Sequence, residues 1–151
     1  MKIGVIGTGF VGLTTAIGFA HKKFNVNCYE INKTKRDFLK KSKIPFHEPY
    51  LQKYLVKYNN KRINFSENLK KFVELNMDAI FICVGTPSKK DGSCNSDKLE
   101  KLIKDLSNIS FKKKTCLIIK STITPGTTDK LYNYLKKNKF LSLVFRPEFL
   151  R

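Results

Sequence analysis

The sequence lacks three features that would each point to a particular class of protein. None of its four cysteines belongs to a C-x-x-C pair, so neither a metal site nor a disulfide is indicated. No apolar run approaches the length of a membrane span. The first residues contain no charged segment followed by a long apolar stretch, as a secretory signal would. We therefore expect no bound metal, no membrane association and a cytoplasmic location.

The cysteines that are present lie in two kinds of segment. Cys28, Cys83 and Cys116 fall inside apolar runs that are typical of strands, and Cys94 falls in a predicted loop. A free cysteine packs as a small hydrophobic side chain. We predict that the first three are buried and reduced, as is usual in a reducing compartment.

Acidic residues are scarce, with 12 against 30 basic residues and a formal net charge of +18. Such a charge raises nucleic-acid binding as an alternative function, whose affinity would fall steeply with salt. The lysines are, however, spread over every segment, and no nucleic-acid-binding motif accompanies them. This distribution favours a solvated surface that attracts small anionic ligands, such as a dinucleotide and a sugar nucleotide, and no specific nucleic acid.

The composition is that of a folded chain. Hydrophobic residues make up 41% and aromatic residues 12% of the 151 residues, which excludes a disordered protein. This length suits one domain with a full core. We expect a single domain over residues 1–151.

A glycine-rich motif follows the first apolar run. Residues 3–6 are typical of a buried strand, and Gly7, Gly9 and Gly12 come directly after it. Gly7 would allow a tight turn, Gly9 would let backbone N–H groups approach a pyrophosphate, and Gly12 would let the next helix lie close to the strand. That helix is predicted over residues 13–20, with its N-terminus facing the phosphates.

An acidic residue stands where a dinucleotide fold needs one. A second strand over residues 25–30 ends at Glu30, 18 positions after Gly12. A carboxylate there can accept hydrogen bonds from a ribose diol. Asn32 is expected to cap a helix over residues 32–41, which would bring Lys35 close to Glu30. Because glycine also serves ordinary turns, a βαβ unit without a ligand remains the alternative.

The rest of the chain continues the alternation of strands and helices. Two prolines make residues 44–51 a turn-rich connector, and a helix is expected to restart at Pro49. Further strands are predicted over residues 62–65, 78–84, 115–120 and 141–145, and further helices over residues 96–106, with Ser96 as cap, and from residue 127 or 128 to 137. The pattern predicts an α/β fold of the Rossmann type, a doubly wound, mainly parallel sheet of six strands in the order 3-2-1-4-5-6 with helices on both faces.

Polar residues follow two of the predicted central strands. Gly85, Thr86 and Pro87 come after one, and Ser121 and Thr122 come after another. Ligands of doubly wound sheets bind outside the carboxyl ends of the strands, so Thr86 is placed for a phosphate or ribose contact. For Gly85 to Pro87 alone, a simple strand end is an equally good interpretation. The six predicted strand–helix units complete a dinucleotide-binding sheet, and no residues remain to orient a substrate. We therefore expect this chain to be part of a larger protein.

Several motifs together carry a resemblance to a known family. They are residues 7–13, Glu30 to Asn32 with Lys35, residues 45–49, residues 81–87, Ser121 to Ile123 with Gly126 and Thr127, and residues 147–151. Along its whole length the chain resembles the N-terminal domain of the UDP-glucose 6-dehydrogenases and related nucleotide-sugar dehydrogenases. The resemblance implies NAD as cofactor, and it implies that Val11, Glu30, Lys35, Thr86 and Thr122 contact it. From the motifs and the resemblance together, the expected cofactor-binding residues are Gly7, Gly9, Phe10, Val11, Gly12, Glu30, Lys35, Gly85, Thr86, Pro87, Ser121 and Thr122.

The resemblance also implies catalytic and substrate-binding roles. Glu148 matches a carboxylate proposed as the base for thioester hydrolysis, and Thr122 matches a hydroxyl that positions the catalytic water. Glu148, Phe149, Leu150 and Arg151 match the start of the segment that holds the UDP-sugar. The chain departs from the family pattern with Arg146 in place of Asn, Tyr50 in place of Gly and Glu30 in place of the commoner Asp.

The family oxidises the C6 alcohol of the sugar twice, through a cysteine thiohemiacetal and a thioester, and consumes two NAD. Its nucleophilic cysteine lies in a Gly-x-Cys-x-Pro-Lys-Asp motif that this sequence lacks. We therefore expect the C-terminal catalytic domain to be absent and the fragment to be inactive and monomeric, with a homo-oligomer at full length. UDP-glucose is the expected substrate. GDP-mannose or UDP-N-acetylhexosamine dehydrogenases, and a non-catalytic dinucleotide-binding module, are the alternatives.

Overall fold

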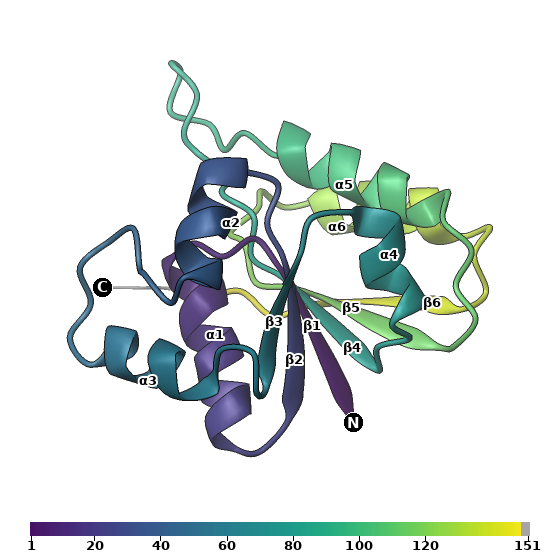
Figure 1. The fold of residues 1–151 in the computed structure, drawn as a ribbon. Helices are drawn as coiled ribbons and strands as arrows, with labels where there is room; N and C mark the ends of the chain where they lie inside the picture. The colour runs from purple at the N-terminus through teal and green to yellow at the C-terminus, as the bar shows by residue number, and fades with distance from the viewer. Residues whose placement is uncertain (149–151) are drawn as a thin grey trace.

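Six parallel strands form one twisted sheet in the computed structural model, which describes residues 1–148 (Figure 1). Their order is β3-β2-β1-β4-β5-β6, which confirms the predicted order. All the pairings between these strands are parallel. The strands are β1 (Lys2–Ile6), β2 (Asn25–Tyr29), β3 (Ile63–Ser66), β4 (Ala79–Ile82), β5 (Thr115–Ile119) and β6 (Leu141–Phe145).

Helices cover both faces of the sheet, as expected (Figure 1). One face carries α1 (Phe10–His21), α2 (Lys33–Lys40) and α3 (Leu51–Tyr58). The other carries α4 (Leu69–Glu74), α5 (Asp97–Ser107) and α6 (Thr127–Leu135). Each face has its own hydrophobic core.

Strand β1 contributes side chains to both cores. It pairs with β2 on one side and with β4 on the other. Because side chains alternate along a strand, Val5 packs into the core beneath α1, whereas Ile6 packs into the core on the opposite face. The chain reverses its direction of winding between β1 and β4, and this topological switch point is where doubly wound folds bind ligands.

Helices α1, α3 and α4 differ most from the prediction, and α6 ends at Leu135, two residues before its predicted end. Helix α1 begins at Phe10, three residues earlier than expected, because the N–H of Leu13 already bonds to the carbonyl of Gly9. Helix α3 begins at Leu51 rather than Pro49, after Tyr50 in the left-handed region. Helix α4 was not predicted. It is only six residues long, and its one local sequence signal is the N-cap Asn68, whose side chain accepts the N–H of Lys71.

Ser96 is the N-cap of α5, as predicted, but its side chain makes no capping hydrogen bond to a backbone N–H. Ser96 precedes α5, yet its hydroxyl donates to Glu100 at 3.1 Å instead of accepting a backbone N–H. At the start of α2, the side chain of Asn32 does accept the N–H of Lys35. The two caps therefore use different means to begin their helices.

The cysteines are less uniformly buried than predicted. Cys28 is buried, whereas Cys83 and Cys116 are half-buried. Burial nevertheless raises the pKa of Cys83 to about 12, so its thiol is protonated at neutral pH. Within residues 1–148, no helix has both the length and the apolar character needed to cross a bilayer.

Candidate functional site

A cleft of about 840 Å³ opens at the carboxyl ends of the central strands. It lies at the switch point between β1 and β4, the position expected from the topology. Most of the predicted cofactor residues line it, as do Thr122 and Glu148. The predicted residues in the lining are Gly7, Gly9, Phe10, Val11, Glu30, Lys35, Gly85, Thr86, Ser121, Thr122 and Glu148.

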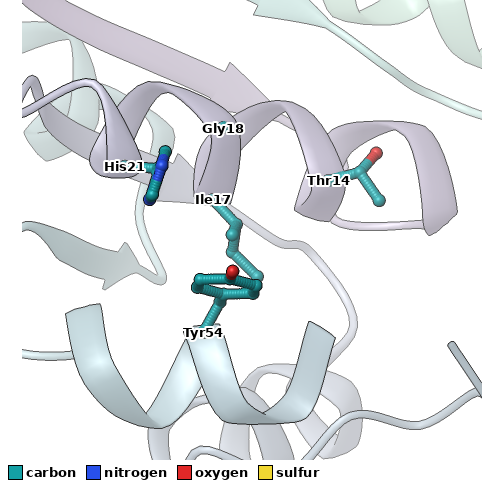
Figure 2. A pocket seen from close by; sticks show the side chains of 5 residues that line it. All are labelled: Thr14, Ile17, Gly18, His21 and Tyr54. Atoms are coloured by element: carbon teal, nitrogen blue, oxygen red, sulfur yellow. The ribbon is translucent and has the colours of Figure 1, made fainter. Parts of the chain in front are cut away.

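A second, smaller pocket of about 290 Å³ lies between α1 and α3 (Figure 2). Ile17 and His21 of α1 meet Tyr54 of α3 there. The hydroxyl of Thr14, also in this pocket, donates to backbone carbonyls of its own helix. None of the predicted site residues lines this pocket, so we assign the ligand site to the larger cleft.

The three motif glycines meet different surroundings. Gly7 has a φ of +85°, which favours glycine. A Cβ on Gly12 would lie 1.8 Å from the carbonyl oxygen of Gly7, so α1 can approach β1 only because this side chain is missing. Around Gly9, by contrast, a Cβ would meet no described heavy atom within 4 Å. Gly7 and Gly12 thus shape the loop, whereas Gly9 leaves room on the cleft side.

The N-terminus of α1 supplies donors for an anion. Gly9 is its N-cap, and in the part of the chain that the structure describes no side chain caps this end. Its first N–H groups are thus left without partners within the helix, beside the cleft lined by Phe10 and Val11. Such an end binds phosphate through these N–H groups and the helix dipole. The residues present therefore fit the pyrophosphate of a dinucleotide.

β2 ends at Tyr29, one residue before the predicted end, and Glu30 directly follows it with a carboxylate that is held by protein donors. The residue is 6% exposed. One oxygen, Oε2, accepts the N–H and the hydroxyl of Thr8 at 3.1 and 2.7 Å, and the other, Oε1, accepts the N–H of Asn32 at 3.0 Å. Burial raises the pKa of Glu30, but the hydrogen bonds from Asn32 and Thr8 and the charge of Lys35 outweigh it and hold the pKa below its usual value. The carboxylate is therefore ionised at neutral pH.

Lys35 lies beside Glu30, as the sequence predicts. Its Nζ is 3.3 Å from Oε2 of Glu30, which confirms the expected proximity. Two further cations, Lys98 and Lys101 of α5, line the same cleft together with Asp105. Sequence reasoning missed these three residues. Their spacing along α5 puts them on one face of the helix, and that spacing was the available signal.

The loops after β4 and β5 are tied together beside the cleft. The hydroxyl of Thr86 donates to the carbonyl of Thr122 at 2.8 Å, and the hydroxyl of Ser121 donates to the carbonyl of Val84 at 2.6 Å. Thr122 itself is exposed. Gly12 and Pro87 are absent from the lining, and Gly12 instead packs closely against Gly7 and Cys83.

The cleft ends at an ion pair between Lys120 and Glu148. The backbone N–H of Glu148 also donates to the carbonyl of Lys120 at 3.1 Å. The hydrogen bond and charge of Lys120 hold the pKa of Glu148 below its usual value. Sequence reasoning selected Glu148 and missed Lys120. The other predicted substrate residues, Phe149, Leu150 and Arg151, lie outside the described residues.

Comparisons with known proteins show the family and the fold of the chain. Residues 1–151 match the model of the UDP-glucose/GDP-mannose dehydrogenase family, NAD binding domain. The chain is 37% identical to the UDP-glucose 6-dehydrogenase of Rickettsia prowazekii, covering all of this chain and 35% of that protein.

Two solved structures share the fold. A UDP-glucose dehydrogenase from Pyrobaculum islandicum has a TM-score of 0.89 at 29% identity, covering 99% of this chain and 36% of that one. A ternary complex of GDP-mannose dehydrogenase from Pseudomonas aeruginosa has a TM-score of 0.89 at 29% identity. The match covers 100% of this chain and 37% of that one. The chain thus spans about a third of the length of the proteins that it matches.

Proposed function

Because the chain belongs to the UDP-glucose/GDP-mannose dehydrogenase family, as its NAD-binding domain, we propose that the full-length protein uses NAD to oxidise the C6 alcohol of UDP-glucose to the carboxylate. The observation that carries this proposal is the single cleft that joins the glycine loop, Glu30, Thr122 and Glu148. The cofactor and the groups assigned to catalysis would then share one space.

Each part of the cleft has a distinct task in this proposal. The N–H groups at the start of α1 bind the pyrophosphate, and Oε1 of Glu30 accepts a hydrogen bond from the adenosine ribose. Thr86 and Thr122 flank the nicotinamide half. Bound NAD supplies the hydride acceptor. This chain therefore holds and orients the cofactor before any substrate group is needed.

Glu148 and Thr122 are assigned to the water that releases the acid. Glu148 is ionised beside Lys120, and only the ionised form can take a proton from water. The hydroxyl of Thr122 orients that water. Phe149, Leu150 and Arg151 would begin the segment that holds the UDP-sugar.

A turnover assay with three substrates tests the function. The full-length protein is given NAD with UDP-glucose, GDP-mannose or UDP-N-acetylmannosamine, and the absorbance of NADH is followed. We expect the highest kcat/KM with UDP-glucose. A higher value with GDP-mannose would move the proposal to the second candidate, which the likeness to GDP-mannose dehydrogenase favours. No oxidation of any sugar nucleotide would instead favour a non-catalytic dinucleotide-binding module.

The chain of residues 1–151 gives a complementary test. We propose that it binds NAD but forms no NADH when UDP-glucose is added, because the donor is not held against the cofactor. Loss of that proximity can be worth roughly 7 to 11 kcal/mol of the barrier. Measurable NADH from this chain would show that the catalytic groups lie within it.

A further inference from the structure

Thr8 is a polar side chain with no exposed surface in the loop between Gly7 and Gly9. Its hydroxyl donates to Oε2 of Glu30 at 2.7 Å, and its N–H donates to the same oxygen at 3.1 Å. Thus one residue of the glycine loop clamps one oxygen of a carboxylate that lies 22 residues further along the chain.

The two oxygens of Glu30 are consequently unequal. Oε2 accepts both donors of Thr8 and lies 3.3 Å from Nζ of Lys35. Within residues 1–148, Oε1 accepts only the N–H of Asn32, at 3.0 Å. A carboxylate oxygen can accept about two hydrogen bonds. Oε1 therefore keeps an acceptor position, whereas Oε2 is saturated.

We propose that Thr8 is a positioning residue for nucleotide selectivity, which holds Glu30 so that Oε1 alone is presented to the ribose diol of NAD. The inference rests on the proposed role of Glu30 as the ribose-binding group. A fixed carboxylate also cannot swing away from the 2′-phosphate of NADP. The hydroxyl of Thr8 thereby contributes both to the affinity for NAD and to the rejection of NADP.

A purely structural role for Thr8 would have a different signature. The backbone N–H bonds from Thr8 and Asn32 do not involve the side chain of Thr8, so Glu30 keeps one backbone donor from the glycine loop and one from Asn32 when that side chain is changed. A structural loss would weaken the binding of NAD and NADP in equal proportion. Loss of positioning would change their ratio.

Two matched pairs of variants isolate the hydroxyl. Thr8→Val replaces it with a methyl group of similar size, and the wild type is its partner. Thr8→Ser and Thr8→Ala lack the same methyl group and differ only in the hydroxyl, so this pair serves if the valine variant does not fold. Circular dichroism establishes folding, and calorimetry gives the dissociation constants of NAD and NADP. Glu30→Gln is measured alongside.

We expect the ratio of the NADP to the NAD dissociation constant to fall about tenfold in Thr8→Val and in Thr8→Ala, since a hydrogen bond to a charged group is lost. Thr8→Ser should keep the wild-type ratio within about twofold, because the hydroxyl remains. Unchanged ratios in the folded valine and alanine variants, with a reduced ratio in Glu30→Gln, would overturn the role of Thr8 alone. An unchanged ratio in Glu30→Gln would overturn the ribose assignment and the role of Thr8 together.

Discussion

The two carboxylates of the cleft are held in opposite ways. The side chain of Glu30 is 8% exposed, accepts hydrogen bonds from Thr8 and Asn32, and forms an ion pair with Lys35. The side chain of Glu148 is 47% exposed, and its one described side-chain partner is Lys120. The group assigned to cofactor recognition is thus fixed by several protein contacts, whereas within residues 1–148 the group assigned to catalysis is exposed and held by one ion pair. Preorganisation and access are divided between the two ends of one cleft.

Substitutions of Glu148 and Thr122, at the exposed end of the cleft, should have the largest effect on turnover. In the full-length protein, Glu148→Gln and Thr122→Ala are expected to lower kcat by ~10² to 10⁴, the usual effect of losing a positioned base or the group that orients its water. The dissociation constant of NAD should change by less than about threefold, since the pyrophosphate and ribose contacts remain. Steady-state kinetics and calorimetry separate these quantities. An unchanged kcat in Glu148→Gln would remove Glu148 from the mechanism.

A substitution in the buried part of the glycine loop should have its main effect on stability. Gly12→Ala would place a Cβ 1.8 Å from the carbonyl oxygen of Gly7 and 3.1 Å from Cβ of Cys83. Because the first of these neighbours is backbone, the loop must shift, and we expect a loss of about 3 kcal/mol in the free energy of unfolding. Urea denaturation measures this loss. A variant with wild-type stability would mean that α1 does not need this close approach.

Gly9→Ala is the matched counterpart of that change. Its Cβ would meet no described heavy atom within 4 Å, so the free energy of unfolding should stay within about 0.5 kcal/mol of the wild type. The new methyl group would occupy the space proposed for the pyrophosphate, and NAD should bind roughly a hundredfold more weakly. Calorimetry gives the affinity. Tight NAD binding by this variant would place the pyrophosphate elsewhere.

The smallest expected effect is a pH dependence of stability at the buried end. The pKa of Glu30 is held below its usual value, so its ionised form stabilises the fold above the pKa that it has in the unfolded chain. That contribution is lost as the pH falls through the lowered pKa of the folded state. The difference in unfolding free energy between the wild type and Glu30→Gln should therefore shrink as the pH falls below the ordinary pKa of glutamate and through the lowered pKa of the folded state. A difference that grows on acidification would contradict this sign.

The sequence predicts the framework of the cleft better than its fixed contacts. The strands, the glycine loop and the proximity of Lys35 to Glu30 follow from local patterns, because strands, turns and caps are set by neighbouring residues. The strand order follows from the alternation of strands and helices together with the topology of doubly wound folds. The clamp of Thr8 on Glu30 joins residues far apart in the chain, and no local pattern reports it. Helix α4 was missed because six residues give too short a period. Lys98 and Lys101 were missed because lysines occur throughout the sequence.

A titration of the 151-residue chain with NAD and with NADP tests the central claim most directly. One unit of like charge at about 4 Å and an effective dielectric near 20 is worth roughly 4 kcal/mol. Solvation and Lys35 reduce this value, so we expect NADP to bind about thirtyfold more weakly than NAD. Tyr54→Ala, in the pocket between α1 and α3, should bind NAD as the wild type does. Failure to bind NAD, equal constants for the two cofactors, or a loss of binding in Tyr54→Ala would contradict the account.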